Sequence, residues 1–251
     1  MDFITKRMNY KQESITPYGD TRSKTEQVEQ MFDNIAHSYD LLNHVLSLGI
    51  DRNWRRKSIE VLKDYPHGQM LDLATGTGDF AILACSMLHP QKMMACDISD
   101  EMMAVGRQKA QEKGWKDIIT FQREDGTCMS FPDATFDIAT IAFGVRNFHD
   151  LDLGLKEIKR VLKPSGQLLI LELSTPHHPL AKAFFYLYAH FWMPMVGRLL
   201  SKDRRAYSYL PATMEVFPQG EEMAGILRKA GFTSVRFRRY TFGLCTCYLA
   251  S

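Results

Sequence analysis

The sequence predicts an α/β fold in which a mainly parallel β-sheet is covered by helices on both faces. Three observations carry this prediction. From residue 69 onward, apolar runs of strand length alternate with segments of helical periodicity. The first of these runs ends in a turn that holds two glycines. The last part of the chain, 234–250, has the pattern of two strands joined by a tight connection.

The repeated strand and helix units occupy the middle of the chain. Five apolar runs bounded by turn residues predict buried strands at 69–75, 92–98, 118–124, 136–143 and 167–173. The segments between them predict helices at 80–88, about 100–113 and about 151–162. Gly114 ends the second helix, and Pro164, Ser165 and Gly166 close the third. Strands joined by such helices pair in parallel.

A last helix and a hairpin complete the expected sheet. The helix covers about 219–230 and ends at Gly231. The hairpin covers 234–250, with its tight connection at 241–243. Five parallel strands and two hairpin strands predict a seven-stranded, mostly parallel sheet with a C-terminal antiparallel hairpin.

The N-terminal part of the chain precedes the strand and helix units. Residues 1–22 are polar and aperiodic, so we expect a mobile N-terminus. Ser23 and Glu26 have the spacing of a capping box. The apolar residues that follow at helical spacing are Val28, Met31, Phe32 and Ile35. The helical pattern is interrupted near Gly49 and then resumes.

The chain is expected to form one domain over 23–251, with a helical lid at 23–64 and an insertion at 177–220. Its 251 residues are enough to bury a sizeable core without disulfides or metal. Hydrophobic residues make up 45% and charged residues 24%, which is ordinary for a globular protein and excludes a disordered or collagenous chain.

Charge and cysteine content exclude several classes of function. The net charge is +2, so no global field favours nucleic acid as a partner. The five cysteines are odd in number and form no C-x-x-C pair, which favours reduced thiols in the cytoplasm. We see no secretory signal, no apolar stretch of about 20 residues and no metal-ligand spacing.

The turn after the first predicted strand is the main functional signal. It reads Asp72-Leu73-Ala74-Thr75-Gly76-Thr77-Gly78-Asp79. Glycine allows positive φ and a close approach of the backbone to a ligand, and the helix that follows offers free N–H groups. A third glycine at the dinucleotide spacing is absent, and Asp79 at the helix start would repel a pyrophosphate.

An acidic residue at the end of the second predicted strand supports a nucleoside ligand. Asp97 follows Asp72 by 25 residues and can accept hydrogen bonds from ribose hydroxyls, with Ile98 beside it. Asp125 and Gly126 follow the third strand, where they can meet an adenine amino group, and Ala142 ends the fourth strand. S-adenosylmethionine has a ribose, an adenine and no phosphate, so it is the cofactor that we expect. A glycine turn that only tightens packing is the alternative.

Three further segments carry a resemblance to a known family. They are Tyr39-Asp40-Leu41-Leu42-Asn43 with Ser47, Gly49 and Trp54; Phe143-Gly144-Val145-Arg146-Asn147; and Arg160-Val161-Leu162-Lys163-Pro164-Ser165-Gly166 followed by Glu172-Leu173-Ser174. From about residue 25 to its end, the chain resembles the ubiquinone/menaquinone biosynthesis C-methyltransferases. The resemblance implies a Rossmann-like class I methyltransferase fold and transfer of a methyl group from S-adenosylmethionine to a ring carbon of a polyprenylated quinol. Demethylmenaquinol is the first candidate acceptor, and a benzoquinol of ubiquinone synthesis is the second.

The chain departs from the family pattern at four positions. The family usually has Met, His and Gly where this chain has Leu42, Asp51 and Ser165, and often a small polar residue in place of Ala142. The His-to-Asp difference weakens any catalytic role that the resemblance would give to position 51.

The catalytic candidates are Arg146, Asn147, His149, Tyr39 and Asp40. Arg146 and Asn147 follow the fourth strand at the carboxyl edge of the sheet, where ligands bind. Arg146 can stabilise a quinol oxyanion but stays protonated, so it is a poor base. His149 is the nearest residue that titrates near neutral pH. Tyr39 and Asp40 belong to the expected lid. The structural alternatives are an arginine paired with a carboxylate, a surface histidine and local helix capping.

The segment 183–205 is aromatic and then basic. It predicts either a buried helix or a surface that holds a prenyl tail and contacts anionic lipid at the inner face of the membrane. A homodimer is left open. The rival functions are a methyltransferase of another acceptor, a cofactor-binding module without catalysis and a nicotinamide oxidoreductase.

Overall fold

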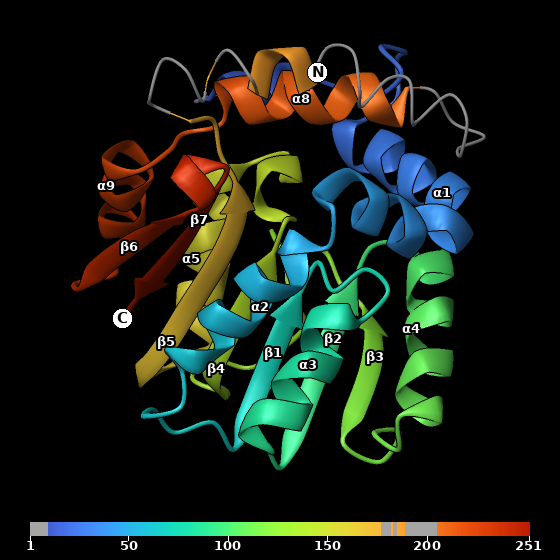
Figure 1. The fold of residues 1–251 in the computed structure, drawn as a ribbon. Helices are drawn as coiled ribbons and strands as arrows, with labels where there is room; N and C mark the ends of the chain where they lie inside the picture. Colours follow the sequence, from blue (N-terminus) through green and yellow to red (C-terminus); the bar gives the residue numbers. More distant parts are fainter. Residues whose placement is uncertain (1–9, 177–181, 183–184, 189–204) are drawn as a thin grey trace, which may run out of the picture.

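The computed structural model describes residues 10–176, 182, 185–188 and 205–251, which form a three-layer α/β/α domain (Figure 1). Its sheet has seven strands in the order β3-β2-β1-β4-β5-β7-β6. The strands are β1 (Gln69–Leu73), β2 (Lys92–Asp97), β3 (Ile119–Arg123), β4 (Phe136–Ala142), β5 (Leu162–Leu173), β6 (Val235–Tyr240) and β7 (Cys245–Ala250). Strands β1 to β5 pair in parallel, and β7 pairs antiparallel with both neighbours. The predicted sheet and hairpin are confirmed.

Helices cover both faces of this sheet. The α-helices named among the described residues are α1 (Lys24–Ser47), α2 (Ile50–Glu60), α3 (Asp79–Leu88), α4 (Asp100–Glu112), α5 (Leu151–Val161), α8 (Ala206–Val216) and α9 (Glu221–Lys229), and all of them except α1 and α8 lie on the faces of the sheet. Successive side chains of a strand point to opposite faces. Accordingly, Leu168 and Ile170 of β5 pack with α5 and α9, whereas Leu169 and Leu171 pack with α2 and α3.

The chain reverses its direction of winding between β1 and β4, which are neighbours at the centre of the sheet. Ligands of such sheets bind outside the carboxyl ends of the strands at this point. Two non-glycine residues there have positive φ, Ala74 after β1 (54°) and Phe143 after β4 (62°). Strain of this kind gathers at functional sites, so the backbone itself marks this edge of the sheet.

The N-terminal helices form as the sequence predicts. Ser23 Oγ accepts from the backbone N–H of Glu26, and the Glu26 carboxylate accepts from the N–H of Ser23, which completes the capping box. Helix α1 ends at Leu48 and Gly49, both in the left-handed region (φ 52° and 74°). In Figure 1, α1 and α8 lie over the upper edge of the sheet, to which the parallel strands point.

The described part of the expected free N-terminus, 10–22, is packed against the domain. Gln12 and Glu13 in the short 3-10 helix η1 (Lys11–Ser14) are buried. A Glu13 carboxylate oxygen accepts from the backbone N–H of Leu151 at 2.9 Å, and Tyr10 donates to Asp152 at 2.8 Å. The polar texture that suggested mobility reflects these polar contacts with the start of α5.

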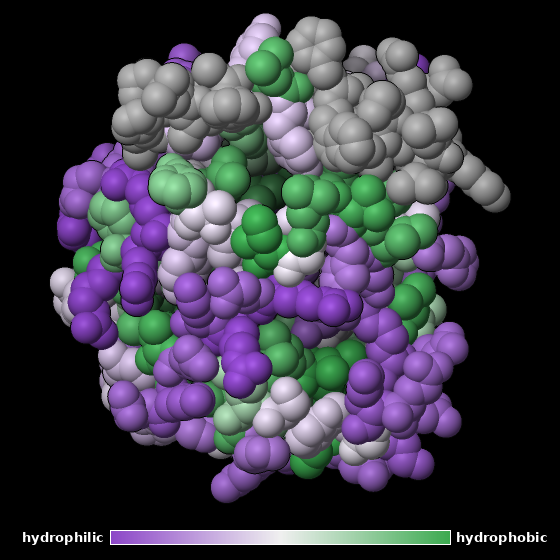
Figure 2. All heavy atoms as spheres, viewed as in Figure 1, coloured by the Kyte–Doolittle hydropathy of each residue, from purple (hydrophilic) through white to green (hydrophobic). Residues whose placement is uncertain are grey.

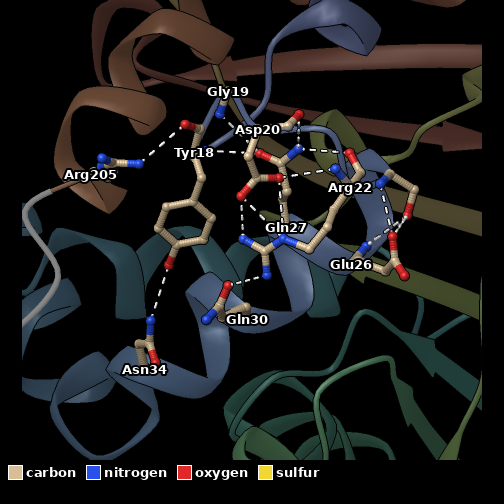
Figure 3. A network of polar contacts seen from close by, with 10 residues as sticks. Tyr18, Gly19, Asp20, Arg22, Glu26, Gln27, Gln30, Asn34 and Arg205 are labelled. Atoms are coloured by element: carbon tan, nitrogen blue, oxygen red, sulfur yellow. Dashed lines mark hydrogen bonds and ion pairs between the residues drawn. The ribbon is translucent and has the colours of Figure 1, made fainter.

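Gln27 of α1 holds the rest of this segment in place (Figure 3). It is fully buried, its Oε1 accepts from the backbone N–H groups of Tyr18 and Gly19, and its Nε2 donates to the carbonyls of Asp20 and Arg22. Arg205, next to α8, donates to the Tyr18 carbonyl at 3.1 Å. The N-terminal loop therefore connects α1 with α8 above the sheet.

Two expectations differ from the structure or lie outside it. Strand β5 begins at Leu162, five positions before the predicted start, because Leu162 pairs with Phe136 before the register shifts and Gln167 pairs with Ile138. Pro164, Ser165 and Gly166 therefore lie in an irregular part of a strand. Most of 183–205 lies outside the described residues.

Candidate active site

Two cavities meet at the carboxyl edge of the sheet. The first, which we call the cofactor cavity, lies among the turns that follow β1, β2, β3 and β4 and is closed on one side by α1. The second, which we call the acceptor cavity, has a volume of about 680 Å³ and lies between α1, α2 and α8. Phe32, Tyr39 and Phe143 line both cavities, so these three side chains form their common boundary.

The turn after β1 is held by two buried aspartates. Asp72 accepts hydrogen bonds from the hydroxyls of Thr75 and Thr140, both at 2.6 Å. Burial raises the pKa of Asp72 to about 6, against the effect of these two hydroxyls. Asp97 accepts from the backbone N–H of Gly76 at 2.7 Å and of Ser99 at 3.0 Å. Burial also raises the pKa of Asp97, and these N–H groups oppose that shift.

The charged groups of the cofactor cavity, among the described residues, are carboxylates. Asp97, Glu124 and Asp125 line it, and Oδ1 of Asn147 is buried with no hydrogen-bond partner among the described residues. No lysine or arginine is among the described residues of the lining. Such a set disfavours a phosphate and suits a ligand rich in hydroxyl and amino donors that carries positive charge. S-adenosylmethionine has this pattern, in its ribose, adenine, ammonium and sulfonium groups.

The predicted cofactor residues fall into two groups. Gly76, Asp97, Ile98, Asp125, Gly126 and Ala142 line the cofactor cavity, whereas Asp72, Thr77 and Gly78 do not. Asp72 is turned into the sheet toward Thr140. Thr77 donates to Asp40 at 2.6 Å, and an added Cβ on Gly78 would be 3.1 Å from Phe121. These three residues support the turn from the side that faces away from the cofactor cavity.

The acceptor cavity is lined mainly by apolar side chains, with a few polar and charged ones among them. Figure 2 shows hydrophobic residues around a hollow in the upper half of the molecule, between the grey atoms. Leu48, Ile50 and Phe242 line this cavity and are also exposed, at 75%, 37% and 85%. They form a rim of exposed apolar side chains, which we call the apolar rim. A large apolar cavity with an apolar rim suits a lipophilic ligand.

Arg146 provides a fixed cation in the wall of the acceptor cavity. Its Nη1 donates to Oε1 of Glu172 at 2.8 Å and to the carbonyl of Phe143. Arg146 and Glu172 are both buried, and Nε of Arg146 has no hydrogen-bond partner among the described residues. The arginine is therefore a buried cation that is paired with a carboxylate and whose N–H groups are not all hydrogen-bonded among the described residues.

The other catalytic candidates are divided between the cavities. Tyr39 lines both, and burial raises the pKa of its phenol, against the effect of a hydrogen bond with Asn43. Asn147 and His149 line the cofactor cavity, where His149 Nδ1 lies 3.1 Å from Oγ1 of Thr25. Asp40 is among the described lining of neither cavity.

Helix α2 supplies polar residues that the sequence analysis did not single out as binding groups. Its buried residues are Asp51, Trp54, Arg55, Ser58 and Ile59. The spacing i, i+3, i+4, i+7 and i+8 is that of one helix face, and it would have placed Asp51 and Arg55 with the core-facing residues. Arg55 and Tyr209 of α8 also line the acceptor cavity.

Comparisons with known proteins identify the family of this chain. The model of the ubiE/COQ5 methyltransferase family matches residues 20–251. A demethylmenaquinone methyltransferase of Bacteroides fragilis is 56% identical over 97% of this chain and all of that protein. The protein of the same name from Porphyromonas gingivalis is 42% identical over 94% of this chain and 97% of its own length.

Solved structures support the fold alone. A Thermotoga maritima protein described as an S-adenosylmethionine-dependent methyltransferase has a TM-score of 0.62 at 18% identity and covers 88% of this chain and 98% of its own. The [4+2]-cyclase SpnF has a TM-score of 0.64 at 21% identity and covers 88% of this chain and 77% of its own, although that protein is named for a different reaction. The family match decides between them: this chain belongs to the ubiE/COQ5 methyltransferase family, whose methyl donor, S-adenosylmethionine, fits the cofactor cavity.

Proposed function

We propose that this chain transfers a methyl group from S-adenosylmethionine to a ring carbon of demethylmenaquinol, a polyprenylated naphthoquinol. The observation that carries the proposal is the meeting of an acceptor-rich cofactor cavity with a large apolar cavity at Phe32, Tyr39 and Phe143. The relatives at 56% and 42% identity carry the name demethylmenaquinone methyltransferase, which favours the naphthoquinol. More distant relatives, at 41% and 40% identity, are named for both ubiquinone and menaquinone.

The residues of the acceptor cavity fit the chemistry of a quinol. Bound S-adenosylmethionine supplies an electrophilic methyl group on a sulfonium. A quinol ring carbon becomes nucleophilic when the hydroxyl on the neighbouring carbon loses its proton. Arg146 is buried beside the boundary of the two cavities, where a fixed cation stabilises the resulting oxyanion far better than water would. Phe32, Tyr39 and Phe143 exclude water from the place of transfer.

The prenyl tail of the acceptor leaves the cavity past the apolar rim. We expect Leu48, Ile50 and Phe242 to contact the membrane surface at the inner face, together with the aromatic segment 183–205 that the sequence analysis proposes for this contact. No helix among the described residues is long and apolar enough to cross a membrane. A homodimer stays a prediction, which sedimentation of the purified protein would check.

The proposal is tested with purified protein, S-adenosylmethionine labelled in the methyl group and a short-tailed demethylmenaquinol kept reduced. We expect a product with the label on the ring carbon and a higher kcat/KM than for a benzoquinol with the same tail. Label on a quinol oxygen, or a preference for the benzoquinol, would contradict the proposal.

Arg146 variants test the role of the fixed cation. In single-turnover reactions, Arg146→Ala should lower the methyl-transfer rate by roughly a hundred- to a thousandfold, as loss of an oxyanion-stabilising donor does elsewhere. Arg146→Lys should recover part of the rate, because it keeps the charge and loses the planar fork. A folded Arg146→Ala enzyme within about threefold of the wild-type rate would return Arg146 to a structural role.

A further inference from the structure

Arg55 of α2 is a second buried arginine in the wall of the acceptor cavity. It is 8% exposed, and its Nε has no hydrogen-bond partner among the described residues. The nearby Oδ2 of Asp51 lies 3.4 Å from this Nε, a distance that makes an ion pair without hydrogen-bond geometry. A buried N–H without an acceptor is destabilising, so the fold leaves the hydrogen-bonding capacity of the Arg55 guanidinium incompletely satisfied.

The carboxylate beside Arg55 also has capacity for a ligand. Asp51 is 5% exposed and lines the acceptor cavity. Its Oδ1 accepts from the hydroxyl of Ser47 at 2.6 Å, and Nδ1 of His44 lies 3.7 Å from the same oxygen. A carboxylate can accept about four hydrogen bonds. The Asp51–Arg55 pair can therefore accept a hydrogen bond from a hydroxyl and also donate a hydrogen bond to the oxygen of that hydroxyl.

Both arginines of the acceptor cavity contact Phe143. Arg55 lies over the Phe143 ring, with its guanidinium carbon 5.0 Å from the ring centroid. Arg146 donates to the Phe143 carbonyl. Phe143 also lines the cofactor cavity. The wall thus holds two guanidinium groups, one from α2 and one from the turn after β4, at the residue where the cavities meet.

We propose that the Asp51–Arg55 pair binds the second hydroxyl of a 1,4-quinol and so orients its ring between the cavities. This inference rests on the proposed function. One hydroxyl of the quinol, the near hydroxyl, is on the carbon next to the methylated carbon and meets Arg146. The other, the far hydroxyl, is across the ring. The far hydroxyl donates a hydrogen bond to Asp51, and the Arg55 guanidinium donates one to the oxygen of that hydroxyl. Arg55 is thus a specificity-determining residue for 1,4-dihydroxy arenes.

The test compares two acceptors that differ only at the far hydroxyl. One is geranyl-1,4-naphthoquinol, and the other is the geranyl-1-naphthol that lacks the far oxygen. Binding of each to the full-length protein is measured by calorimetry, and methyl transfer is measured separately. Arg55→Met should weaken quinol binding and raise its KM by about tenfold or more, with little change in kcat. Binding of the naphthol should stay within twofold of wild type.

Matched variants separate this role from a structural one. Arg56→Met removes the neighbouring arginine, which is exposed and pairs with Glu60. This variant should bind both acceptors as wild type does. Arg55→Lys should recover part of the quinol affinity. Removing Arg55 alone leaves a buried Asp51 charge, so the double variant Asp51→Asn/Arg55→Met serves if the single one does not fold.

The outcomes distinguish the two proposals. If Arg55→Met or the double variant weakens the binding of both acceptors equally, or of neither, the second-hydroxyl site is wrong. Quinol methylation is judged separately, from the wild-type transfer reaction, and is not contradicted by this result. Wild type could bind the quinol more tightly than the naphthol, and Arg55→Met could lose that preference. If wild type then methylates neither acceptor, the site stands and the proposed function is wrong. If wild type binds neither acceptor, both are wrong.

Discussion

Asp72 shows how one buried carboxylate makes stability depend on pH. Its folded pKa of about 6 lies above the ordinary value of 3.8 because it is buried. An acid with a raised folded pKa contributes stability that is complete below the unfolded pKa and is lost as pH rises through the folded one. The charged form of Asp72 is therefore a cost at neutral pH, although its two threonine contacts shape the turn after β1.

The prediction at this residue concerns Asp72→Asn. Between pH 4 and pH 7, the unfolding free energy of wild type should fall relative to that of the variant by up to roughly 3 kcal/mol, at 1.36 kcal/mol per pKa unit. Denaturant titrations at several pH values measure the difference. Asp133→Asn, which removes a carboxylate whose side chain is 78% exposed, is the control and should show no such trend. A difference independent of pH would mean that Asp72 is ionised in the fold as easily as in the unfolded chain.

At the scale of elements, Asp40 anchors α1 to the cofactor turn. Its Oδ1 accepts from Thr77 at 2.6 Å, and its Oδ2 pairs with Lys109 of α4 at 2.7 Å. Lys109 also pairs with Asp79 at the start of α3, so the charge that the sequence analysis took as repelling a pyrophosphate is partly neutralised. Asp40 thus acts on the site through the position of α1.

We therefore expect Asp40→Ala to loosen the wall that α1 gives to the cofactor cavity. Loss of one charge-assisted contact, worth about 1.5 kcal/mol, corresponds to about tenfold weaker cofactor binding. Calorimetry with S-adenosylmethionine measures it, and Glu60→Gln on α2, which removes an exposed ion pair, is the control. Cofactor affinity within twofold of wild type would limit Asp40 to a local structural contact.

Elements were predictable where their periodicity is undisturbed. The strands predicted at 69–75 and 136–143 form at 69–73 and 136–142, and helix α1 forms where the capping box and the apolar spacing predict it. The start of β5 was not predictable, because Pro164, Ser165 and Gly166 are typical of a turn. The register shift that accommodates them depends on the pairing of β5 with Phe136. In the site, the turn at Gly76 and the acid at Asp97 lie in the cavity that their spacing predicts. Asp51 and Arg55 could not be assigned to a ligand, because the cavity that they line is completed by distant segments that carry Phe143 and Tyr209.

At the scale of the whole molecule, the apolar rim joins the acceptor cavity to the surface. Leu48 and Phe242 are its most exposed members, and both have positive φ, at 52° and 56°. For most residues other than glycine and asparagine, this backbone conformation is strained. Neither exposure nor backbone geometry favours leucine or phenylalanine at these positions, which supports the membrane contact that we propose for the rim.

Phe242→Asn tests this contact. Asparagine tolerates positive φ, so we expect an equal or higher melting temperature. Removing a side chain worth about 1.5–3 kcal/mol on burial should lower binding to quinol-containing vesicles by about tenfold. Leu153→Asn on α5, where the leucine is 42% exposed and is not among the residues lining the acceptor cavity, is the control. If Phe242→Asn sediments with vesicles as wild type does, the apolar rim does not contribute to the membrane contact.

Helix α1 contributes Phe32 and Tyr39 to both cavities at once. One wall therefore serves two ligands, so we expect the first ligand to restrict the motion of that wall for the second. The second ligand would then lose less conformational entropy on binding, and calorimetry should show positive cooperativity without a change of fold. Thermodynamic linkage makes the effect reciprocal: the factor by which bound cofactor tightens the quinol equals the factor by which bound quinol tightens the cofactor.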